Sequence, residues 1–212
     1  VTLPHKQAVL GHLDALAPEA ALAGAANTVV VHRDERVQLT GHNTDVEGLG
    51  ASLAEQGARL QGSAVVVTGS GGMARAAAAA ALQSGARALT LCARAPQKAG
   101  ALLDEMAGRW PGVRPRLAVS ALAEAAAALA EADVLVQATC LGMQPADPLP
   151  VALDAAPPGL VVLDAVYGAG AESEHHPQHS GPWIHTLFPD KRVIRHADAA
   201  DIREKILLAI GP

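Results

Sequence analysis

The stretch Ala64-Val65-Val66-Val67-Thr68-Gly69-Ser70-Gly71-Gly72-Met73-Ala74 decides the fold of this chain. Its first five residues predict a buried strand, and the small residues that follow fit the pattern G-x-G-x-x-A at the start of a helix. One glycine permits a tight turn, the next lets the backbone approach a pyrophosphate, and Ala74 stands where helix packs on strand. A helix N-terminus also favours an anion. The alternative is an ordinary strand-to-helix turn. The residues expected to bind a nucleotide are Gly69, Ser70, Gly71, Gly72, Met73 and Ala74.

The pattern around this turn continues from residue 64 to residue 165. Short β-branched runs alternate with alanine-rich amphipathic runs, which is typical of βαβ units. The expected strands are apolar on both sides of the pleat, as in parallel strands covered by helices on both faces. The predicted fold class is therefore α/β, a Rossmann-like doubly wound parallel sheet. The expected strands are 64–68, 88–92, 116–119, 133–138 and 160–164, and the expected helices are 73–84, 97–109 and 121–130.

The sequence pattern is different in the two regions that flank this one. Residues 1–58 predict a partial α/β domain, with helices over 4–16, 18–23 and 45–56 and strands over 28–32 and 37–40. The polar turn at 56–59 marks the boundary with the nucleotide-binding domain, 59–167. Residues 168–212 are expected to form a divergent loop, with a short strand at 192–195 and a helix over 199–210.

The composition of the chain excludes several classes of protein. Half of its 212 residues are apolar, yet no run is long enough for a bilayer span, and the net charge of −5 comes without a basic cluster. We expect neither a membrane nor a nucleic acid as partner. Cys92 and Cys140 lack CxxC spacing, so we expect two small buried residues in a cytoplasmic protein. His175, His176 and His179 stand in loop sequence, and we expect no metal site there.

The end of the second strand indicates which nucleotide is bound. Proteins that bind NAD place an Asp or Glu there for the ribose hydroxyls. This chain has Cys92-Ala93-Arg94-Ala95-Pro96-Gln97-Lys98, without a carboxylate and with two cations. A 2′-phosphate suits Arg94 and Lys98 better, so NADP is the expected cofactor. The alternative is that both cations belong to an ordinary helix surface.

Three polar clusters precede the nucleotide domain. Lys6 follows Pro4 at a predicted helix start, Asn27 follows the helix over 18–23, and Asp45 begins the helix over 45–56. A lysine and an aspartate that meet in a cleft can move a proton to and from a hydroxyl or ketone while a cofactor moves the hydride. Each residue alone has a simpler role, as a surface lysine, a turn amide or, for Asp45 and Thr44, a helix N-cap.

These clusters belong to a series of motifs that resembles shikimate dehydrogenases. The motifs run through residues 1–167 in the family's order. They are Val1-Thr2-Leu3-Pro4-His5-Lys6, Gly24-Ala25-Ala26-Asn27-Thr28, Gly41-His42-Asn43-Thr44-Asp45 with Gly48-Leu49, the turn Gly69–Ala74, Ala138-Thr139-Cys140-Leu141-Gly142-Met143 and Asp164-Ala165-Val166-Tyr167.

The resemblance implies an enzyme that interconverts shikimate and 3-dehydroshikimate with NADP, in the shikimate pathway of aromatic amino-acid biosynthesis. It makes Lys6 and Asp45 the catalytic pair. It also makes 1–58 the substrate domain, with a monomer or homodimer as the expected assembly. The remaining roles it implies are substrate binding by Thr2, Asn27 and Tyr167, and positions along the nicotinamide for Met143 and Ala165.

Departures from the family pattern leave two alternatives open. We expect the family's N-terminal Ser-x-Ser segment to be missing before Val1, and the tail after Tyr167 to be divergent. The family's Asn-Arg-Thr reads Ala93-Arg94-Ala95 here, which keeps the cation but loses two hydrogen-bonding side chains. The chain could accordingly be a truncated, impaired NADP-binding paralogue. Quinate dehydrogenases share nearly every motif and are the other alternative.

Overall fold

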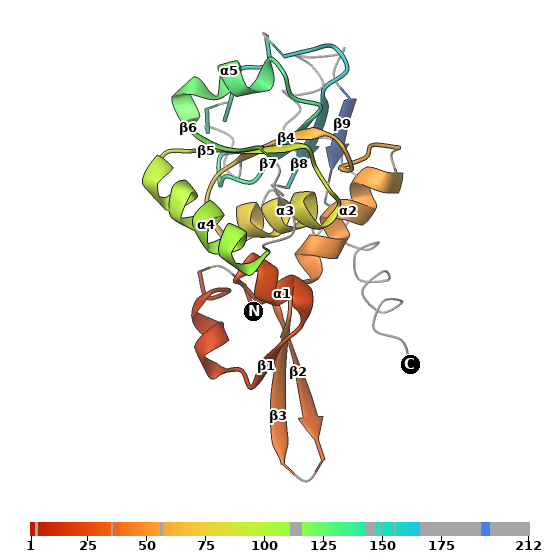
Figure 1. Cartoon of the computed structure of the whole chain (residues 1–212), viewed down its shortest axis with the longest axis vertical. Coiled ribbons are helices and arrows are strands. Elements are labelled where there is room, and N and C mark those ends of the chain that lie inside the picture. The colour runs from red at the N-terminus through yellow and green to blue at the C-terminus, as the bar shows by residue number, and fades with distance from the viewer. Residues whose placement is uncertain are drawn as a thin grey trace.

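The chain folds around two sheets of different kinds (Figure 1). The computed structural model describes residues 1–2, 4–34, 36–55, 57–110, 116–142, 147–148, 150–154 and 156–165, and the backbone of 192–195. The larger sheet has the strand order β6-β5-β4-β7-β8-β9, and every pairing in it is parallel. Counted from β4, this is the order 3-2-1-4-5-6 of a doubly wound dinucleotide-binding sheet. The predicted fold class is confirmed.

Helices cover both faces of the larger sheet. Figure 1 shows α3 and α4 on one face and α5 on the other. The strands are β4 (Ala64–Thr68), β5 (Ala88–Ala93), β6 (Arg116–Ala121), β7 (Val134–Gln137), β8 (Val161–Asp164) and β9 (Arg192–Arg195). The helices between them are α3 (Gly72–Gln83), α4 (Pro96–Arg109), the 3-10 helix η2 (Leu122–Glu124) and α5 (Ala125–Leu129).

The pleat of the central strand divides the interior into two apolar cores. Val65 and Val67 belong to one core and Val66 to the other, because successive side chains of a strand point to opposite faces. The larger core also contains Leu22 and Leu49, which come from the N-terminal region. That region therefore packs directly on the nucleotide-type sheet and its helix α3.

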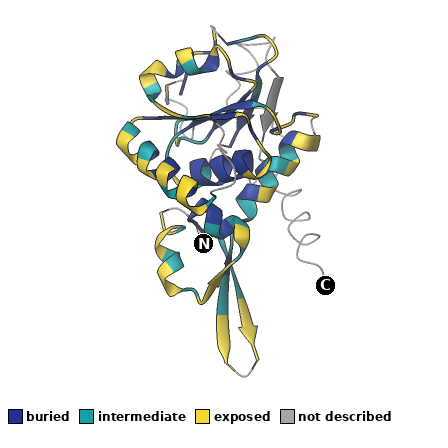
Figure 2. Cartoon of the chain, in the orientation of Figure 1, coloured by how far each residue is buried: buried dark blue, intermediate teal, exposed yellow. Residues whose placement is uncertain are grey.

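The smaller sheet is built from the N-terminal region. Strands β2 and β3 form an antiparallel hairpin, and β1 pairs with β3 in parallel. The hairpin is buried or half-buried where it meets the rest of the molecule and exposed toward its tip (Figure 2). The elements here are the 3-10 helix η1 (Ala8–His12), β1 (Ala15–Leu16), α1 (Pro18–Ala23), β2 (Thr28–Arg33), β3 (Val37–His42) and α2 (Thr44–Glu55).

Two helix predictions are wrong. Residues 4–7 form a turn and η1 is 3-10 helix, so no α-helix spans 4–16. Asp14 explains the end of this segment: its backbone N–H donates to Leu39 O and its carboxylate accepts from Leu39 N, which draws the chain onto β3. The helix expected over 121–130 is also shorter, because Ala121 still pairs with β5 as the last residue of β6.

Other outcomes concern the edges of the sheet and the cysteines. No residue of strand β6 is buried, unlike the fully buried strand expected, because it is the last strand in the order. The strand expected at 192–195 is confirmed as β9, parallel to β8, whereas the helix expected over 199–210 lies outside the described residues. Cys92 is buried as expected, but Cys140 is exposed on the loop after β7. Within the described ranges, none of the helices has the length and apolarity that crossing a membrane requires.

Candidate active site

Lys6 and Asp45 meet at the junction of the two regions. Lys6 Nζ lies 2.6 Å from Asp45 Oδ2, and the two side chains are 16% and 17% exposed. Lys6 stands in the turn before η1, where its carbonyl accepts from Ala26 N at 2.8 Å. Asp45 stands in the first turn of α2, where the helix dipole favours a carboxylate. Two residues 39 positions apart thus form a charged, sheltered pair.

Asn27 lies beside this pair and closes the start of α2. Its Oδ1 accepts from Thr44 N at 3.1 Å, and its Nδ2 donates to Thr44 Oγ1 at 3.0 Å. The first N–H groups of a helix have no partner within the helix, so the amide satisfies one of them. Asn27 therefore fixes the backbone next to Asp45, in addition to any contact with substrate.

The other predicted substrate residues differ in what the structure says of them. Thr2 is exposed, and its carbonyl accepts from His5 N at 2.9 Å, which shapes the turn that carries Lys6. Tyr167 and the cofactor residue Met143 lie outside the described residues. Lys6, Asp45 and Asn27 are thus the predicted residues that the structure brings together.

The glycine turn has the geometry that the pattern predicts. Gly69 has a φ of 104°, which disfavours other residues, and its N–H donates to Cys92 O at 2.8 Å. A Cβ atom at Gly69 would lie 2.8 Å from Ala138 O, so the turn and the loop after β7 touch only because this side chain is absent. Ala74 is fully buried where α3 packs on the sheet.

The N-terminus of α3 is open at Gly71. Its N-cap residue is Gly71, which has no side chain that could cap the helix. A Cβ atom at this position would meet no atom within 4 Å. The first turn contains no acidic residue. Backbone N–H groups next to open space form a site that a phosphate can approach closely. Ser70 and Met73, half-buried on either side, complete the turn.

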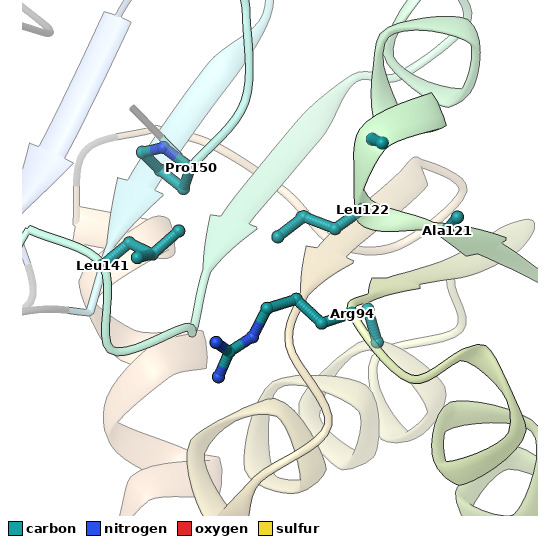
Figure 3. Close-up of a pocket in the computed structure, with 7 residues that line it drawn as sticks. Arg94, Ala121, Leu122, Leu141 and Pro150 are labelled. Carbon is teal, nitrogen blue, oxygen red and sulfur yellow. The ribbon is translucent and has the colours of Figure 1, made fainter. Parts of the chain in front are cut away.

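A cavity of about 420 Å³ lies at the carboxyl ends of the neighbouring strands. Figure 3 shows Leu122 and Leu141 pointing toward each other across it, with the Arg94 guanidinium to one side of the gap. An apolar slot with a cation at its rim suits a flat base attached to a phosphorylated sugar. The residues that line it are Ala93, Arg94, Ala121, Leu122, Ala123, Leu141 and Pro150.

Two further cofactor predictions fall on the same edge of the sheet. Ala165 directly follows β8, is buried, and donates its N–H to Gln137 O at 3.0 Å. Lys98 is exposed in the first turn of α4 and is not one of the cavity's lining residues. Arg94 is therefore the cation that the structure places at the cavity.

A buried polar network, which the sequence did not predict, holds the loop after β7. Thr68 Oγ1 donates to Gln137 Oε1 at 2.7 Å, and Gln137 Nε2 donates to Leu141 O at 2.9 Å. Thr139 N donates to the same Gln137 oxygen at 3.0 Å. Polar residues at the ends of two adjacent parallel strands are the signal that could have revealed this network, since such ends meet at one edge.

The thiols and the other potential ligands have ordinary surroundings. Burial raises the pKa of Cys92 to about 11, so this thiol stays protonated near neutrality. Within the described part of the chain, no three His, Cys, Asp or Glu side chains gather as a metal site would require. The histidines at 175, 176 and 179 lie outside that part.

Models of known protein families match both regions. The shikimate dehydrogenase substrate binding domain matches residues 1–29, and the shikimate / quinate 5-dehydrogenase model matches residues 52–142. The first match contains Lys6 and Asn27, and the second contains the glycine turn and Arg94.

Curated relatives agree with these matches. A shikimate dehydrogenase (NADP(+)) of Rubrobacter xylanophilus is 41% identical over 170 residues, which are 80% of this chain and 58% of the relative. The corresponding protein of Symbiobacterium thermophilum is 43% identical over 169 residues, 79% of this chain and 56% of the relative. The chain thus spans somewhat more than half the length of these relatives.

Solved structures resemble the fold over a similar span. The shikimate 5-dehydrogenase of Thermus thermophilus, in complex with NADP(H) and shikimate, is 35% identical with a TM-score of 0.61, over 77% of this chain and 56% of that one. The quinate dehydrogenase of Corynebacterium glutamicum, in complex with NAD, is 34% identical with a TM-score of 0.67, over 78% and 57%. With two matching family models and these relatives, the chain belongs to the shikimate dehydrogenase family.

Proposed function

We propose that this protein interconverts shikimate and 3-dehydroshikimate with NADP as cofactor. The observation that carries the proposal is the Lys6–Asp45 pair, 2.6 Å apart and beside the helix that begins at the glycine turn. A Cβ atom at Gly72 would lie 3.1 Å from Lys6 Cδ, so the lysine stem touches the first residue of α3. Proton-transfer groups next to a dinucleotide turn are what a hydride-transfer enzyme requires.

The residues at the carboxyl edge fit NADP. The open N-terminus of α3 would hold the pyrophosphate on the backbone of 69–74. Arg94 at the cavity rim would pair with the 2′-phosphate, with Lys98 nearby along the chain. Ala165 and Met143 would adjoin the nicotinamide. When bound, the cofactor supplies the hydride acceptor or donor.

Lys6 and Asp45 would handle the proton. Reduction of the ketone builds negative charge on its oxygen, and the Lys6 ammonium stabilises that charge and then gives up a proton to it. Asp45 Oδ2 holds the ammonium in place through the 2.6 Å contact. In the oxidation direction the same pair removes the proton from the hydroxyl. Because both side chains are largely sheltered, their charges are less screened than at an open surface.

Substrate recognition would fall to the N-terminal region. We assign Thr2 and Asn27 to substrate binding and Tyr167 to the end that carries the carboxylate, as the family's pattern implies. The half-buried Asn27 amide is already turned toward the start of α2, next to Asp45. In this division residues 1–58 present the substrate and residues 59–167 the cofactor.

We also place the protein in the cytoplasm. An exposed free thiol at Cys140 suits a reducing compartment.

Steady-state kinetics with shikimate and NADP⁺ test the proposal. We expect the Lys6→Ala variant to lose about 10²–10⁴ in kcat, the usual contribution of acid–base catalysis, with a much smaller change in KM. Lys98→Ala is the matched control, since the same truncation there should raise the KM for NADP⁺ and spare kcat. A Lys6→Ala variant that kept more than about a tenth of the parent kcat would remove Lys6 from catalysis.

The same assay separates the two alternatives. Quinate in place of shikimate tests the substrate, because the matching family model and one solved relative carry the name quinate. A higher kcat/KM with quinate would overturn the substrate assignment. Tight NADPH binding without turnover of either compound would instead support an impaired paralogue and overturn the enzymatic proposal.

A further inference from the structure

One face of α3 is turned toward the segment that carries Lys6. Gly72 and Arg75 are three residues apart, which places them on the same side of the helix. Gly72 lies against the Lys6 stem, where an added Cβ would come within 3.1 Å of Cδ. Arg75 reaches the next residue along, Gln7. The helix that begins at the glycine turn therefore contacts two consecutive residues, Lys6 and Gln7.

Arg75 joins three separate parts of the chain. With the Gln7 amide oxygen turned toward it, Arg75 Nε and Nη2 donate to that oxygen at 2.6 and 2.8 Å. Nη1 donates to Ala23 O at the end of α1, 3.2 Å away, and Nη2 also donates to Glu105 Oε2 on α4 at 2.9 Å. The planar fork of a guanidinium can make all these bonds at once, and a lysine could not.

The surroundings keep this guanidinium in one position. Arg75 is only 9% exposed, so each of its bonds would be costly to leave unmade. Glu105 is itself held by Arg109, whose Nη2 lies 2.6 Å from Oε1. At Gly24 a Cβ would come within 3.0 Å of atoms of Arg75, Glu105 and Arg109, so the end of α1 leaves room for all three side chains only because it is glycine.

We infer that Arg75 is a positioning residue for Lys6, acting through Gln7. Its bond to Gln7 fixes the turn from one side, while Gly72 gives the lysine stem a flat surface and Asp45 holds its tip. The helix that would carry the pyrophosphate thereby also sets the place of the proton donor. The inference deepens the proposed function and rests on it for the role of Lys6, but the geometry can be tested independently.

Substitutions at Gln7 give the sharpest test, because this side chain is exposed and its loss should not unfold the protein. Gln7→Met keeps the length and removes the acceptor, Gln7→Glu keeps an acceptor for Arg75, and Gln83→Met makes the same change at the exposed end of α3. The first readout is the rate at which an amine reagent modifies Lys6, relative to the exposed Lys98 in the same molecule. The second is kcat against KM for shikimate.

We expect Gln7→Met to raise the relative labelling of Lys6 about 10-fold, the ratio expected from loss of one hydrogen bond to a charged group. The kcat should fall with KM for shikimate and the Kd for NADPH little changed, and Gln7→Glu should behave like the parent. A purely structural role for Arg75 would leave the labelling ratio unmoved.

Equal labelling of Lys6 in the parent, Gln7→Met and Gln83→Met proteins would overturn the inference, whatever the activity. A parent without NADP-linked turnover would overturn the proposed function and leave the labelling result standing. The two failures are therefore distinguishable.

Discussion

The two sheets of this protein are held in place by different forces. In the six-stranded sheet, the central strand β4 is buried along its whole length, and α3 above it has nine buried residues. In the three-stranded sheet, Val31 and Val37 toward the hairpin tip are 44% and 58% exposed. Apolar burial fixes the first, since removal of apolar surface from water is the main favourable term in folding. It contributes much less at the hairpin tip of the second.

Polar contacts hold the residues around the Lys6–Asp45 pair, which lie next to the smaller sheet. Asn27 bonds to the start of α2, Asn43 Nδ2 donates to Ala25 O at 2.9 Å, and Lys6 pairs with Asp45. Such contacts are directional, so they fix positions closely, but a neutral one contributes only about 0.5–1.5 kcal/mol net and one to a charged group about 1.5–3 kcal/mol. The six-stranded sheet is thus held mainly by apolar burial, whereas the position of the Lys6–Asp45 pair also depends on a few directional contacts.

A matched pair of valine substitutions tests this difference most strongly. Val67→Ala removes two methyl groups from a fully buried position in β4, and we expect the free energy of unfolding to fall by about 2–4 kcal/mol, through lost burial and the cavity left behind. Val37→Ala at the exposed hairpin end should change it by less than about 0.5 kcal/mol. Urea denaturation measures both. Similar losses at the two positions would show that apolar burial holds both sheets equally.

Charge reversal at Arg94 tests the proposed cofactor site at the rim of the cavity. Arg94→Glu replaces the cation at the cavity with the carboxylate that NAD-binding proteins carry, and we expect it to weaken NADPH binding by about 1.5–3 kcal/mol. NADH should be affected far less, because it lacks the 2′-phosphate. Fluorescence titration gives both dissociation constants. An unchanged Kd for NADPH would show that Arg94 does not meet the phosphate.

Asn27 tests a single polar contact beside the Lys6–Asp45 pair. Asn27→Ala removes the acceptor for Thr44 N, and we expect a loss of about 0.5–2 kcal/mol in the free energy of unfolding, as for other helix caps. KM for shikimate should rise at least as strongly as kcat falls, because the amide has no proton to give. Asn27→Asp keeps the acceptor and should recover most of the stability. If alanine and aspartate behaved alike, the cap would be irrelevant.

The larger sheet could be predicted from the sequence because its signals are local. Each strand and helix shows its own periodicity, and the glycine turn fixes where the first pair begins. The prediction over residues 4–16 failed where a distant residue decided the outcome, since Asp14 bonds to Leu39, 25 positions away. The exposed β6 was missed for a related reason, because edge position depends on the order of strands and not on composition.

The candidate site shows the same limit. The sequence marks Lys6, Asp45 and Asn27 first as polar clusters and then as members of shared motifs, and the structure brings them together. Arg75 is one charged residue in an alanine-rich helix, and nothing in the sequence singles it out. Its partners Ala23 and Glu105 stand 52 and 30 positions away, so no spacing in the sequence could announce them. Only the folded structure shows that Arg75 is buried.

The smallest effect we predict concerns Glu105. It bonds to Arg75, which in turn bonds to Gln7, the residue after Lys6. Burial alone would raise the pKa of this carboxyl, but the hydrogen bonds and charges of Arg75 and Arg109 outweigh it and lower the pKa. A carboxyl whose pKa is lower in the folded state binds its proton more weakly there than in the unfolded chain. The stability it contributes is therefore complete above the ordinary carboxyl pKa of about 4.3 and disappears as pH falls through the folded value.

Glu105→Gln should accordingly lower the free energy of unfolding only slightly, and only at pH values where Glu105 is ionised. The side chain is 35% exposed, so solvent screens the pair, and we expect the variant to be less stable at pH 7 by about 0.5–1 kcal/mol. The difference should shrink toward zero as the pH falls below about 4, because protonated Glu105 is then equivalent to glutamine. Glu131→Gln is the matched control, since that carboxylate is 79% exposed and 3.5 Å from Arg116. Urea titrations at a series of pH values measure both. If the stability difference between Glu105→Gln and the parent stayed constant down to pH 3, packing and not charge would hold Glu105 against Arg75. The surroundings of Lys6 would then be stabilised in the same way as the six-stranded sheet.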